Sequence, residues 1–597
     1  MSRFLQVFYV FFSAAMLALA IPNELIKLGS PLAGFIALIP LYIVYSNLKS
    51  YKEAAAIFAL HTFIVHVMTS FWLAFFKDFA ALTLGASAVG TGIIGGFIGV
   101  LMYLPPSPAK KNGFYGSEKT SAARYFVSFK IFRFAAVYTF YEWIKSIGWL
   151  GYPWGTISSA MFRLKIFIQI ADITGTYGIS FLAALFSAAA GEGILLFGNK
   201  NNINARSVFT SYAAAVKTAV ALFALTFLYG IWQYNLPRKP IKYLNTITIQ
   251  QNADPWAQSG DGDTILLSQR LVDKKLEECK AENKRVDLVV WSEGCLRYTF
   301  PDARYHYEYF PPEQPLIPYI GKTGIPFIIG APYRPDENSG RIFNAALLFD
   351  AEGRLRGAYG KNHLVPFAEA IPFSNVPAIR DFLKNVIHIS AGWSPGDQYV
   401  LFDVPAHNPV NKILPAVKIV SLAQRADEQK RDEDAPPYVR FGTPICFDDT
   451  FPEVCTPIVK NGAELLMNLT DDSWSKLDSA EYQHFAVAAF RAIELRTTLA
   501  RSTNAGFSAV VDPAGRIKNS MKNFTADSMF TAIPVYKREC TVYMRFGNWL
   551  PKLIFLFIAA NAVCVFVCVK TGRFEEPESE RKKLDKFRKR MLKKYRI

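Results

Sequence analysis

Cysteine and histidine are scarce in this sequence, which contains seven of each among its 597 residues. A zinc site or a disulfide framework needs cysteines in paired motifs of short, regular spacing. The seven cysteines lack such spacing, and two of them lie in an apolar segment typical of a membrane helix. We therefore predict neither a metal centre nor a disulfide-stapled fold. The cysteines are Cys279, Cys295, Cys446, Cys455, Cys540, Cys564 and Cys568.

Charged residues are sparse over the first 235 or so positions, which are nearly all apolar or aromatic. The next 300 or so residues mix β-branched runs, Gly/Pro turns and charged segments, as a water-soluble enzyme does. A chain of this length also exceeds what one ordinary core contains. We expect membrane helices at 1–237, a catalytic domain at 243–540, another membrane helix at 548–570 and a basic cytoplasmic tail at 571–597.

The net charge of +17 does not indicate nucleic-acid binding. About ten of the Lys and Arg residues lie between Arg581 and Arg596, and others separate hydrophobic segments. Basic residues placed in this way mark the cytoplasmic side of membrane helices. No basic-aromatic motif typical of RNA recognition accompanies them, so we expect no nucleic-acid partner.

Eight segments are apolar enough to be read as membrane spans, which need about 20 residues to cross the hydrocarbon core. Seven precede the soluble region and one follows it. The first two are short, and the sixth is long enough to be bent or partly interfacial. They run from Phe4 to Ala20, Pro31 to Tyr45, Ala54 to Phe76, Phe79 to Leu104, Tyr125 to Leu150, Ile166 to Phe197, Ala213 to Tyr234 and Leu550 to Val569.

The basic loops predict the orientation of these spans. A cytoplasmic N-terminus places three basic loops on the cytoplasmic side, around Lys49, Lys110 and Lys200, as the positive-inside rule requires. Seven spans then deliver the catalytic domain to the outside, and the eighth returns the tail to the cytoplasm. The first span resembles an uncleaved signal anchor, because no small-residue cleavage site follows it.

From Leu244 onward, short β-branched runs alternate with helical segments. The clearest helices are Thr264 to Asn283 and Glu481 to Arg496. This alternation predicts an α/β layered sandwich with functional groups at strand ends. The predicted strands are Thr246 to Gln250, Val286 to Trp291, Phe327 to Ile329, Ala345 to Phe349, Phe441 to Ile445, Leu465 to Leu469 and Ser508 to Val511.

Three segments of this region carry a residue with catalytic potential. Glu293 follows an apolar strand, where desolvation raises the pKa of a carboxyl toward that of a general base. Lys361 lies in an apolar run, where its fixed charge can stabilise an oxyanion while Glu369 holds it. Cys446 opens a turn after a strand, which exposes its sulfur beside backbone N–H groups.

Each of these residues also has an ordinary structural explanation. A carboxylate after a strand is commonly a cap or a surface group, and a lysine in an apolar run commonly extends its charge to the surface. A cysteine at a strand end is commonly buried and inert. The residues taken singly leave these alternatives open, and their order and surroundings decide between them.

The order Glu293, Lys361, Cys446 resembles the nitrilase superfamily, whose members use a Glu-Lys-Cys triad in this order. With its membrane segments, nearly the whole chain resembles the apolipoprotein N-acyltransferase family. The supporting motifs are Gly151-Tyr152-Pro153-Trp154, Gln169 to Gly175 with Tyr177-Gly178, Gln250-Gln251-Asn252, Trp291-Ser292-Glu293, Lys361 to Glu369, Arg491 to Glu494 and Arg501 to Asn504.

The chain departs from the family pattern at three places. Ser292 replaces a proline and Ala368 replaces a glycine, changes that should only adjust a turn. Phe447-Asp448 replaces Tyr-Glu directly after the proposed nucleophile. The shorter carboxylate and the missing hydroxyl must recover their hydrogen bonds elsewhere, which puts acceptor and lipid preference in doubt.

The resemblance implies a fold, a reaction and partners. The fold is a membrane α-helical bundle joined to an α-β-β-α nitrilase-like sandwich. The implied reaction moves a fatty acyl chain from a phospholipid through a Cys446 thioester to the α-amine of a diacylglyceryl-modified N-terminal cysteine of a lipoprotein. It needs no metal or organic cofactor. Supporting or substrate-binding roles are expected for Trp256, Glu369, Phe447 and Asp448.

The same resemblance implies a monomer in the bacterial inner membrane, with its catalytic domain in the periplasm. Two segments suit contact with that membrane: the aromatic run from Tyr298 to Phe310, and the helical stripe from Ile379 to Ile387. Ordinary core packing is the alternative for both. The rival functions are a membrane-anchored amidase or nitrilase, and a transporter or scaffold with an inactive domain. Seven preceding spans argue against a mere anchor, and the complete triad argues against inactivity.

Overall fold

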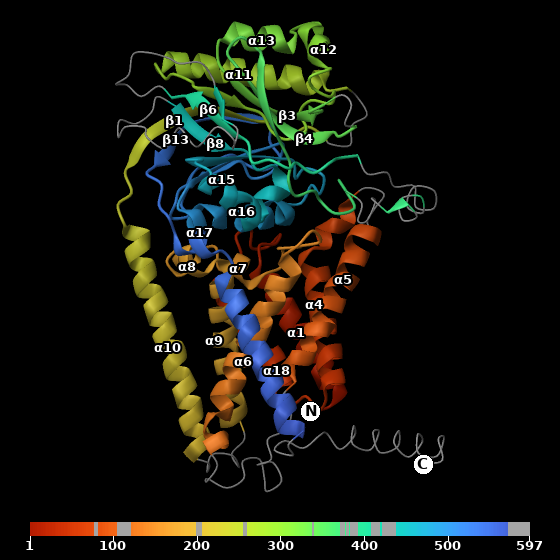
Figure 1. Ribbon diagram of the computed structural model, residues 1–597, viewed down its shortest axis with the longest axis vertical. Helices are drawn as coiled ribbons and strands as arrows, with labels where there is room; N and C mark the ends of the chain where they lie inside the picture. Colours follow the sequence, from red (N-terminus) through yellow and green to blue (C-terminus); the bar gives the residue numbers. More distant parts are fainter. Residues whose placement is uncertain are drawn as a thin grey trace.

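The protein consists of a bundle of long helices beneath two stacked β-sheets (Figure 1). The computed structural model describes residues 1–76, 81–103, 121–198, 206–254, 260–336, 340–370, 376–377, 381, 392–406, 418–420 and 438–570. In Figure 1 the N-terminus lies at the end of the bundle away from the sheets, and α10 runs up to strand β1.

The described bundle contains both long helices and short connecting turns. The helices are α1 (Arg3–Ala20), α2 (Pro31–Ile36), α3 (Ile39–Tyr45), α4 (Tyr51–Thr69), α5 (Ser87–Gly99), α6 (Ser121–Ser146), α9 (Thr176–Phe197), α10 (Arg206–Asn235) and α18 (Trp549–Lys570). The short turns are η1 (Phe71–Phe75), η2 (Ala81–Ala86), η3 (Val100–Met102), α7 (Ile157–Ala160), η5 (Phe167–Ile170) and α8 (Ala171–Thr174).

Four described helices are long and apolar enough to cross a membrane: Arg3–Ala20, Thr83–Met102, Thr176–Phe197 and Phe209–Asn235. Pro31–Tyr45 and Trp549–Cys564 are shorter apolar helices. The chain is therefore a multi-pass membrane protein. Two further predicted spans fold as α4 and α6. Helix α6 carries Arg133, Glu142 and Lys145, whose side chains are buried within the protein.

Some of the predicted spans are not single helices. The segment from Pro31 to Tyr45 breaks at Leu38, ahead of Pro40, because proline supplies no N–H to a continuing helix. The segment from Ile166 to Phe197 breaks at Gly175, which has φ +66°. A Cβ atom there would lie 2.5 Å from the ring of Tyr543, so only glycine fits. The helix of the sixth predicted span therefore begins at residue 176.

The described strands form two mixed sheets. A six-stranded sheet has the order β13-β1-β2-β3-β4-β5, and a seven-stranded sheet has the order β12-β11-β10-β9-β8-β6-β7. The strands are β1 (Pro240–Gln250), β2 (Leu288–Val290), β3 (Phe327–Tyr333), β4 (Phe343–Phe349), β5 (Leu355–Gly360), β6 (Leu401–Pro405), β7 (Lys418–Val420), β8 (Tyr438–Gly442), β9 (Leu465–Thr470), β10 (Thr498–Thr503), β11 (Ala509–Val511), β12 (Ile517–Ser520) and β13 (Asp527–Tyr536).

Helices cover the outer faces of the two sheets, which gives the expected α-β-β-α layers (Figure 1). Helices α11 (Gly262–Ala281), α12 (Arg304–Tyr309) and α13 (Leu316–Thr323) lie over the first sheet. Helices α15 (Pro452–Lys460) and α16 (Asp478–Leu495) lie between the second sheet and the bundle, near the short helix α17 (Val542–Phe546). The predicted helices at 264–283 and 481–496 correspond to α11 and α16.

Successive side chains along a strand of the first sheet pack on opposite faces of that sheet. On β2, Leu288 and Val290 pack toward the second sheet, whereas Val289 packs under α11 and α13. Strand β3 alternates in the same way, with Ile328 on the inner side. Successive side chains of a strand point to opposite faces, so strands covered on both sides are apolar throughout.

The sequence analysis located seven strands and missed six. Strands β5, β6, β7, β10, β12 and β13 were not predicted. Strand β10 contains Arg501 and three hydroxyl residues, and β5 contains two glycines and an arginine, compositions that do not indicate a strand. Pairing with neighbouring strands overrides these local preferences.

A buried ion pair joins the bundle to the catalytic domain. Arg496, at the end of α16, donates to the Asp172 carboxylate at 2.7 Å and to the Gln169 side chain at 2.6 Å. It also donates to the Pro513 carbonyl at 2.8 Å. One apolar cluster continues from the bundle into the space between the sheets. The two predicted parts of the chain therefore share a core.

Candidate active site

The three residues predicted as catalytic follow strands of both sheets. Glu293 follows β2, and Lys361 follows β5. Cys446 follows β8 and opens the turn η8 (Cys446–Thr450). The backbone N–H of Asp471, directly after β9, donates to Glu293 Oε2 at 2.8 Å. This bond joins the end of a strand in the second sheet to a residue of the first.

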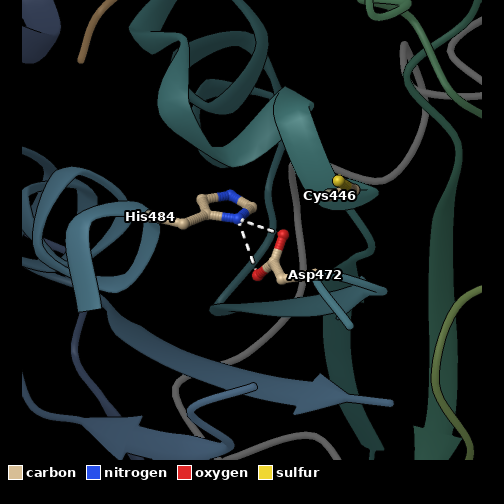
Figure 2. Close-up of side chains that lie close together, drawn as sticks. All are labelled: Cys446, Asp472 and His484. Atoms are coloured by element: carbon tan, nitrogen blue, oxygen red, sulfur yellow. Dashed lines mark hydrogen bonds and ion pairs between the residues drawn. The ribbon is translucent and has the colours of Figure 1, made fainter. Parts of the chain in front are cut away.

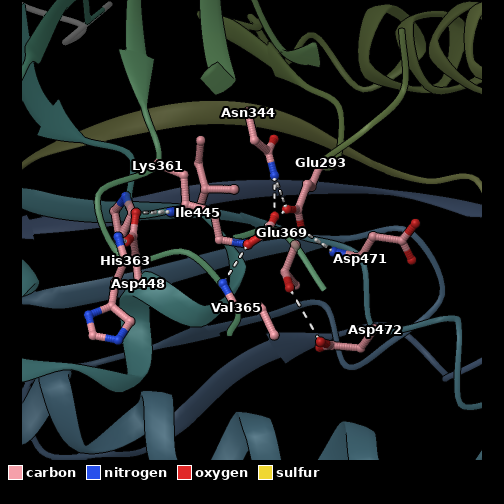
Figure 3. A network of polar contacts seen from close by, with 12 residues as sticks. Glu293, Asn344, Lys361, His363, Val365, Glu369, Ile445, Asp448, Asp471 and Asp472 are labelled. Carbon is pink, nitrogen blue, oxygen red and sulfur yellow. Dashed lines mark hydrogen bonds and ion pairs between the residues drawn. The ribbon is translucent and has the colours of Figure 1, made fainter. Parts of the chain in front are cut away.

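Glu293, Asn344, Lys361 and Glu369 form one polar network (Figure 3). Lys361 Nζ donates to Glu369 Oε1 at 2.9 Å and to Glu293 Oε1 at 3.3 Å. Asn344 Nδ2 donates to the same two oxygens, at 2.9 Å and 2.6 Å. The Val365 N–H holds the other oxygen of Glu369 at 2.8 Å. Lys361 and Asn344 thus fix the two carboxylates in one orientation.

Burial shifts the pKa values of the groups in this network. It raises the pKa of Glu293 to about 7, an effect that the Lys361 cation opposes and Glu369 reinforces. Burial alone would lower the pKa of Lys361, but Cys446, Glu293 and Glu369 raise it well above its ordinary value. Lys361 is therefore a fixed cation at neutral pH, whereas Glu293 can exchange a proton there.

Cys446 lies in an uncommon backbone conformation, with φ +45°. A non-glycine residue with positive φ is strained, and such strain is frequent at functional turns. The side chain remains partly exposed. Burial and then the Glu293 charge raise the pKa of its thiol well above the ordinary value, while Lys361 opposes this shift. The resting residue is a thiol that must lose its proton to react.

Asp448 is fully buried and binds the segment that carries Lys361. Its carboxylate accepts from the His363 N–H at 2.7 Å, the Tyr359 hydroxyl at 2.9 Å and the Ile445 N–H at 3.1 Å. Burial raises its pKa to about 6. Despite its shorter side chain, Asp448 joins the turn that carries Cys446 to the end of β5.

Phe447 packs against the membrane bundle. Its ring stacks on Trp154 with centroids 5.3 Å apart and planes at 13°. It also contacts His363 and Phe451, at centroid distances of 5.4 Å and 4.9 Å. Aromatic packing therefore occupies the position where a tyrosine hydroxyl would need a hydrogen-bond partner.

A buried ionic group lies behind Cys446. His484 on α16 bonds through Nδ1 to Asp472 at 2.8 Å and through Nε2 to Asp449 at 2.9 Å. Arg501 donates to the other oxygen of Asp449 at 2.7 Å. Burial would lower the pKa of His484, but Asp472 and Asp449 raise it to about 9. We call Asp449, Asp472, His484 and Arg501 the His484 group.

Cys446, Asp472 and His484 offer three possible metal-ligand atoms within 4.8 Å of one another (Figure 2). Both ring nitrogens of His484 are already bonded to carboxylates, however. An imidazolium has no lone pair with which to bind a metal. Ion pairing accounts for this cluster, and the chemistry of its donors does not favour a metal centre.

The other residues that the sequence analysis singled out differ in what the structure shows of them. Trp256 lies outside the described residues, and so do the stripe residues Ile379, Phe382, Leu383, Val386 and Ile387. In the aromatic run, Tyr305 and Tyr309 are exposed whereas Tyr307 is buried, so only part of that run can face a membrane. The Ser292 hydroxyl donates to Gln251 Oε1 at 2.9 Å, which satisfies the group introduced in place of proline.

Several residues of the site escaped the sequence analysis as functional candidates. Asp471 and Asp472 follow a predicted strand, and the strand-end rule applied to Glu293 would have found them. His484 lies on a correctly predicted helix, but nothing in its spacing singles it out. Asn344 lies within a strand whose neighbours are apolar, so no local signal marks it.

The arrangement combines a thiol, a base with a pKa near neutrality and a fixed cation. Such a set can form and break a thioester at a carbonyl carbon. The family described as carbon-nitrogen hydrolase matches residues 245–537, which contain both sheets. The matched family belongs to the class of proteins with a nitrilase-type fold. In this chain that fold is attached to a membrane bundle. The family described as apolipoprotein N-acyltransferase N-terminal domain matches residues 13–189.

Curated relatives cover nearly the whole chain. Apolipoprotein N-acyltransferase 2 of Treponema denticola is 38% identical over 96% of this chain and 100% of its own length. Apolipoprotein N-acyltransferase of Borreliella burgdorferi is 30% identical over 92% and 93%. Among solved structures, the carbon-nitrogen hydrolase of Helicobacter pylori G27 matches at 16% identity and a TM-score of 0.31, covering 48% of this chain and 88% of that chain. Because of this similarity to its sequence relatives, the chain belongs to the apolipoprotein N-acyltransferase family.

Proposed function

We propose that this protein transfers a fatty acyl chain from a membrane phospholipid to the α-amine of a diacylglyceryl-modified N-terminal cysteine of a lipoprotein, through a thioester on Cys446. The observation that carries the proposal is the bridge from Lys361 Nζ to both Glu293 and Glu369, beside a strained and partly exposed cysteine. A base, a cation and a thiol are the groups that this acyl transfer requires, and the chemistry needs no metal or organic cofactor.

In the first half-reaction, Glu293 accepts the proton of the Cys446 thiol, and the sulfur attacks the ester carbonyl carbon of the phospholipid. Lys361 Nζ stabilises the negative charge that develops on the carbonyl oxygen. The ester C–O bond then breaks, and the proton held by Glu293 passes to the leaving oxygen. A lysophospholipid departs and the acyl group remains on sulfur.

In the second half-reaction, the α-amine of the lipoprotein attacks the thioester carbon. Lys361 again stabilises the oxyanion, and Glu293 accepts a proton from the nitrogen. The C–S bond breaks to form an amide, and the proton returns to the Cys446 sulfur. The chemistry is balanced with no further reactant, and the two substrates use one site in turn.

A hydrolase would use the same three residues and pass the acyl group to water. Transfer to an amine is supported by the packing of Phe447 against Trp154 of the bundle, with centroids 5.3 Å apart. This contact joins the turn that opens at Cys446 to the segment between α6 and α7, at the end of the bundle next to the sheets, where lipid chains held along the bundle could present their head groups to the site. The family relationship supports the same choice.

Incubation with phospholipid alone tests this proposal. Purified protein should accumulate an acyl group on Cys446, visible as an increase in intact mass and removed by neutral hydroxylamine. A diacylglyceryl lipopeptide should then discharge it. Cys446→Ser is the control, because an acyl-serine ester resists neutral hydroxylamine. Continuous release of free fatty acid without an adduct would favour a hydrolase, and no adduct with either substrate would favour an inactive scaffold.

The proposed orientation has eight spans and a periplasmic catalytic domain. It is supported by the basic residues of the cytoplasmic loops and by the position of the N-terminus at the far end of the bundle from the sheets (Figure 1). A single cysteine introduced between Lys582 and Lys594 tests it. Membrane-impermeant reagents should label this cysteine only after permeabilisation, and labelling in intact cells would reverse the orientation.

A further inference from the structure

The His484 group lies directly behind the proposed nucleophile and has no role in the mechanism given above. A ring nitrogen of His484, a carboxylate oxygen of Asp472 and the sulfur of Cys446 lie within 4.8 Å of one another (Figure 2). All four members of the group are buried. Buried ionic networks are costly to desolvate, which makes their presence beside a reactive thiol informative.

The bonds of His484 connect two segments that hold the reacting groups. Through Nε2 it binds Asp449, which lies in the turn opened by Cys446. Through Nδ1 it binds Asp472, whose neighbour Asp471 donates its backbone N–H to Glu293 at 2.8 Å. A chain of contacts therefore runs from the base, through His484, to the turn that carries the nucleophile.

The charges in this group cancel only when His484 is protonated. Asp449 and Asp472 each contribute one negative charge, and Arg501 contributes one positive charge through its contacts with both, at 2.7 Å and 3.6 Å. Glu481, on the same helix as His484, faces the group, and burial raises its pKa well above the ordinary value, so it remains a neutral acid. The Trp154 ring covers His484 from the bundle side, 5.6 Å away between centroids, and adds no charge.

We propose that His484 is a positioning residue for acyl transfer: it ties the turn of Cys446 to the loop that holds Glu293, and its positive charge keeps the ionic group beside the sulfur neutral. This role rests on the proposed function of Cys446 as nucleophile and of Glu293 as base. His484 acts on them through Asp449 and Asp472 and touches no substrate.

Two substitutions with opposite charge effects test the proposal. His484→Gln leaves two carboxylates against one guanidinium, which disfavours the Cys446 thiolate. Asp472→Asn removes a carboxylate whose charge raises the pKa of Cys446, which favours the thiolate. The rate at which iodoacetamide alkylates Cys446 in detergent reports the thiolate directly. The mass of the peptide that contains Cys446 measures this rate between pH 6 and pH 9. We expect the rate at pH 8 to fall about tenfold in the first variant and to rise about tenfold in the second.

Acyl-enzyme formation from phospholipid should respond differently. Both substitutions break the connection between the two segments, so both should slow this step, by roughly ten- to a hundredfold. Asp472→Asn would thus make the thiol more reactive to a small reagent and less reactive to phospholipid. A merely structural role for His484 would change the two rates in the same direction in both variants.

Lys242→Met is a matched control. Lys242 is a buried cation bound to Glu464 at 2.8 Å, near the start of β1, whereas Glu293 follows the opposite end of the parallel neighbour β2. This substitution should lower the thermal stability without changing the pH dependence of alkylation.

Unchanged alkylation rates in both variants, or wild-type acyl-enzyme formation in either, would overturn the role of His484. If His484→Gln does not fold, Asp472→Asn decides alone through its opposite effects on the two rates. Failure of the wild-type protein to take an acyl group from phospholipid would instead refute the proposed function. The alkylation rates would still report on His484 in that case.

Discussion

The bundle and the catalytic domain both bury charged side chains, but they satisfy them differently. In the bundle, Lys130 pairs with Glu192, while Arg133 donates to the Leu101 carbonyl at 2.8 Å and Lys145 donates to the Trp154 carbonyl at 2.6 Å. In the catalytic domain, carboxylates and cations gather in networks around Cys446. The charges of the bundle mostly fix helix ends and loops, whereas those of the catalytic domain shift the pKa values of Glu293, Lys361 and Cys446.

The two regions meet beside the turn that opens at Cys446. Trp154 belongs to the segment after α6, yet its ring stacks on Phe447 and its carbonyl accepts from Lys145. Gln483 of α16 donates to the carbonyls of Pro22 and Thr69 in the bundle, both at 2.9 Å. The bundle therefore packs against the candidate active site, and substitutions on each side can show whether it also serves as more than an anchor.

The largest effect is expected inside the catalytic network. Lys361→Met removes the cation proposed to stabilise the oxyanion and leaves Glu293 and Glu369 without the cation that they share, so acyl-enzyme formation should fall about 100-fold or more. The rate of adduct formation on Cys446 measures it, with Lys242→Met as the buried-lysine control. Near-normal activity in a folded variant would remove Lys361 from the mechanism.

A smaller effect is expected where the bundle reaches the site. Trp154→Ala removes the ring that supports Phe447 and covers His484, which should slow acyl-enzyme formation by roughly ten- to thirtyfold through misplacement of the nucleophile's turn. Trp232→Ala is the matched control, because Trp232 is exposed on α10. Equal activity of the two variants would mean that the bundle serves only as an anchor.

The pH dependence of acyl-enzyme formation should be determined by the catalytic domain alone. Glu293 has a pKa raised to about 7, so below that pH it is protonated and unable to accept the thiol's proton. Acyl-enzyme formation should therefore rise with pH through about 7 and differ about tenfold between pH 6 and pH 8. Single-turnover rates over this range check the sign, and a rate that fell with rising pH would contradict the role of Glu293 as base.

The smallest effect is expected on the outer face of the bundle. Leu228 on α10 is 65% exposed, so Leu228→Ala should change the free energy of unfolding by less than about 0.5 kcal/mol. Leu185→Ala, at a fully buried position of α9, should cost about 2–5 kcal/mol. Thermal unfolding in detergent compares them. A large loss from Leu228→Ala would show that this face is covered, for example by a second copy of the chain, against the expected monomer.

Local patterns in the sequence were sufficient for the division into a helical bundle and an α/β region, but not for six of the described strands. Apolar runs predicted the membrane helices because lipid requires long apolar segments, and β-branched runs predicted strands that are covered on both faces. Glu293 and Cys446 were chosen as candidates because both follow such strands, and Lys361 because it lies in an apolar run. The break at Leu38 was missed because a kink changes the path of a segment without changing its hydropathy, whereas the length of the sixth predicted span had already indicated a bend, which the structure places at Gly175.

By itself, the sequence determined the family, the division into a bundle and a sandwich, and the order of Glu293, Lys361 and Cys446, because each of these can be read from short motifs and composition along the chain. Only the tertiary structure decided which distant residues meet them. Asn344 bridges two carboxylates, His484 joins two strand ends, and Trp154 covers both Phe447 and His484. These contacts depend on strand pairing and on the docking of two regions, and neither leaves a periodic signal in the sequence.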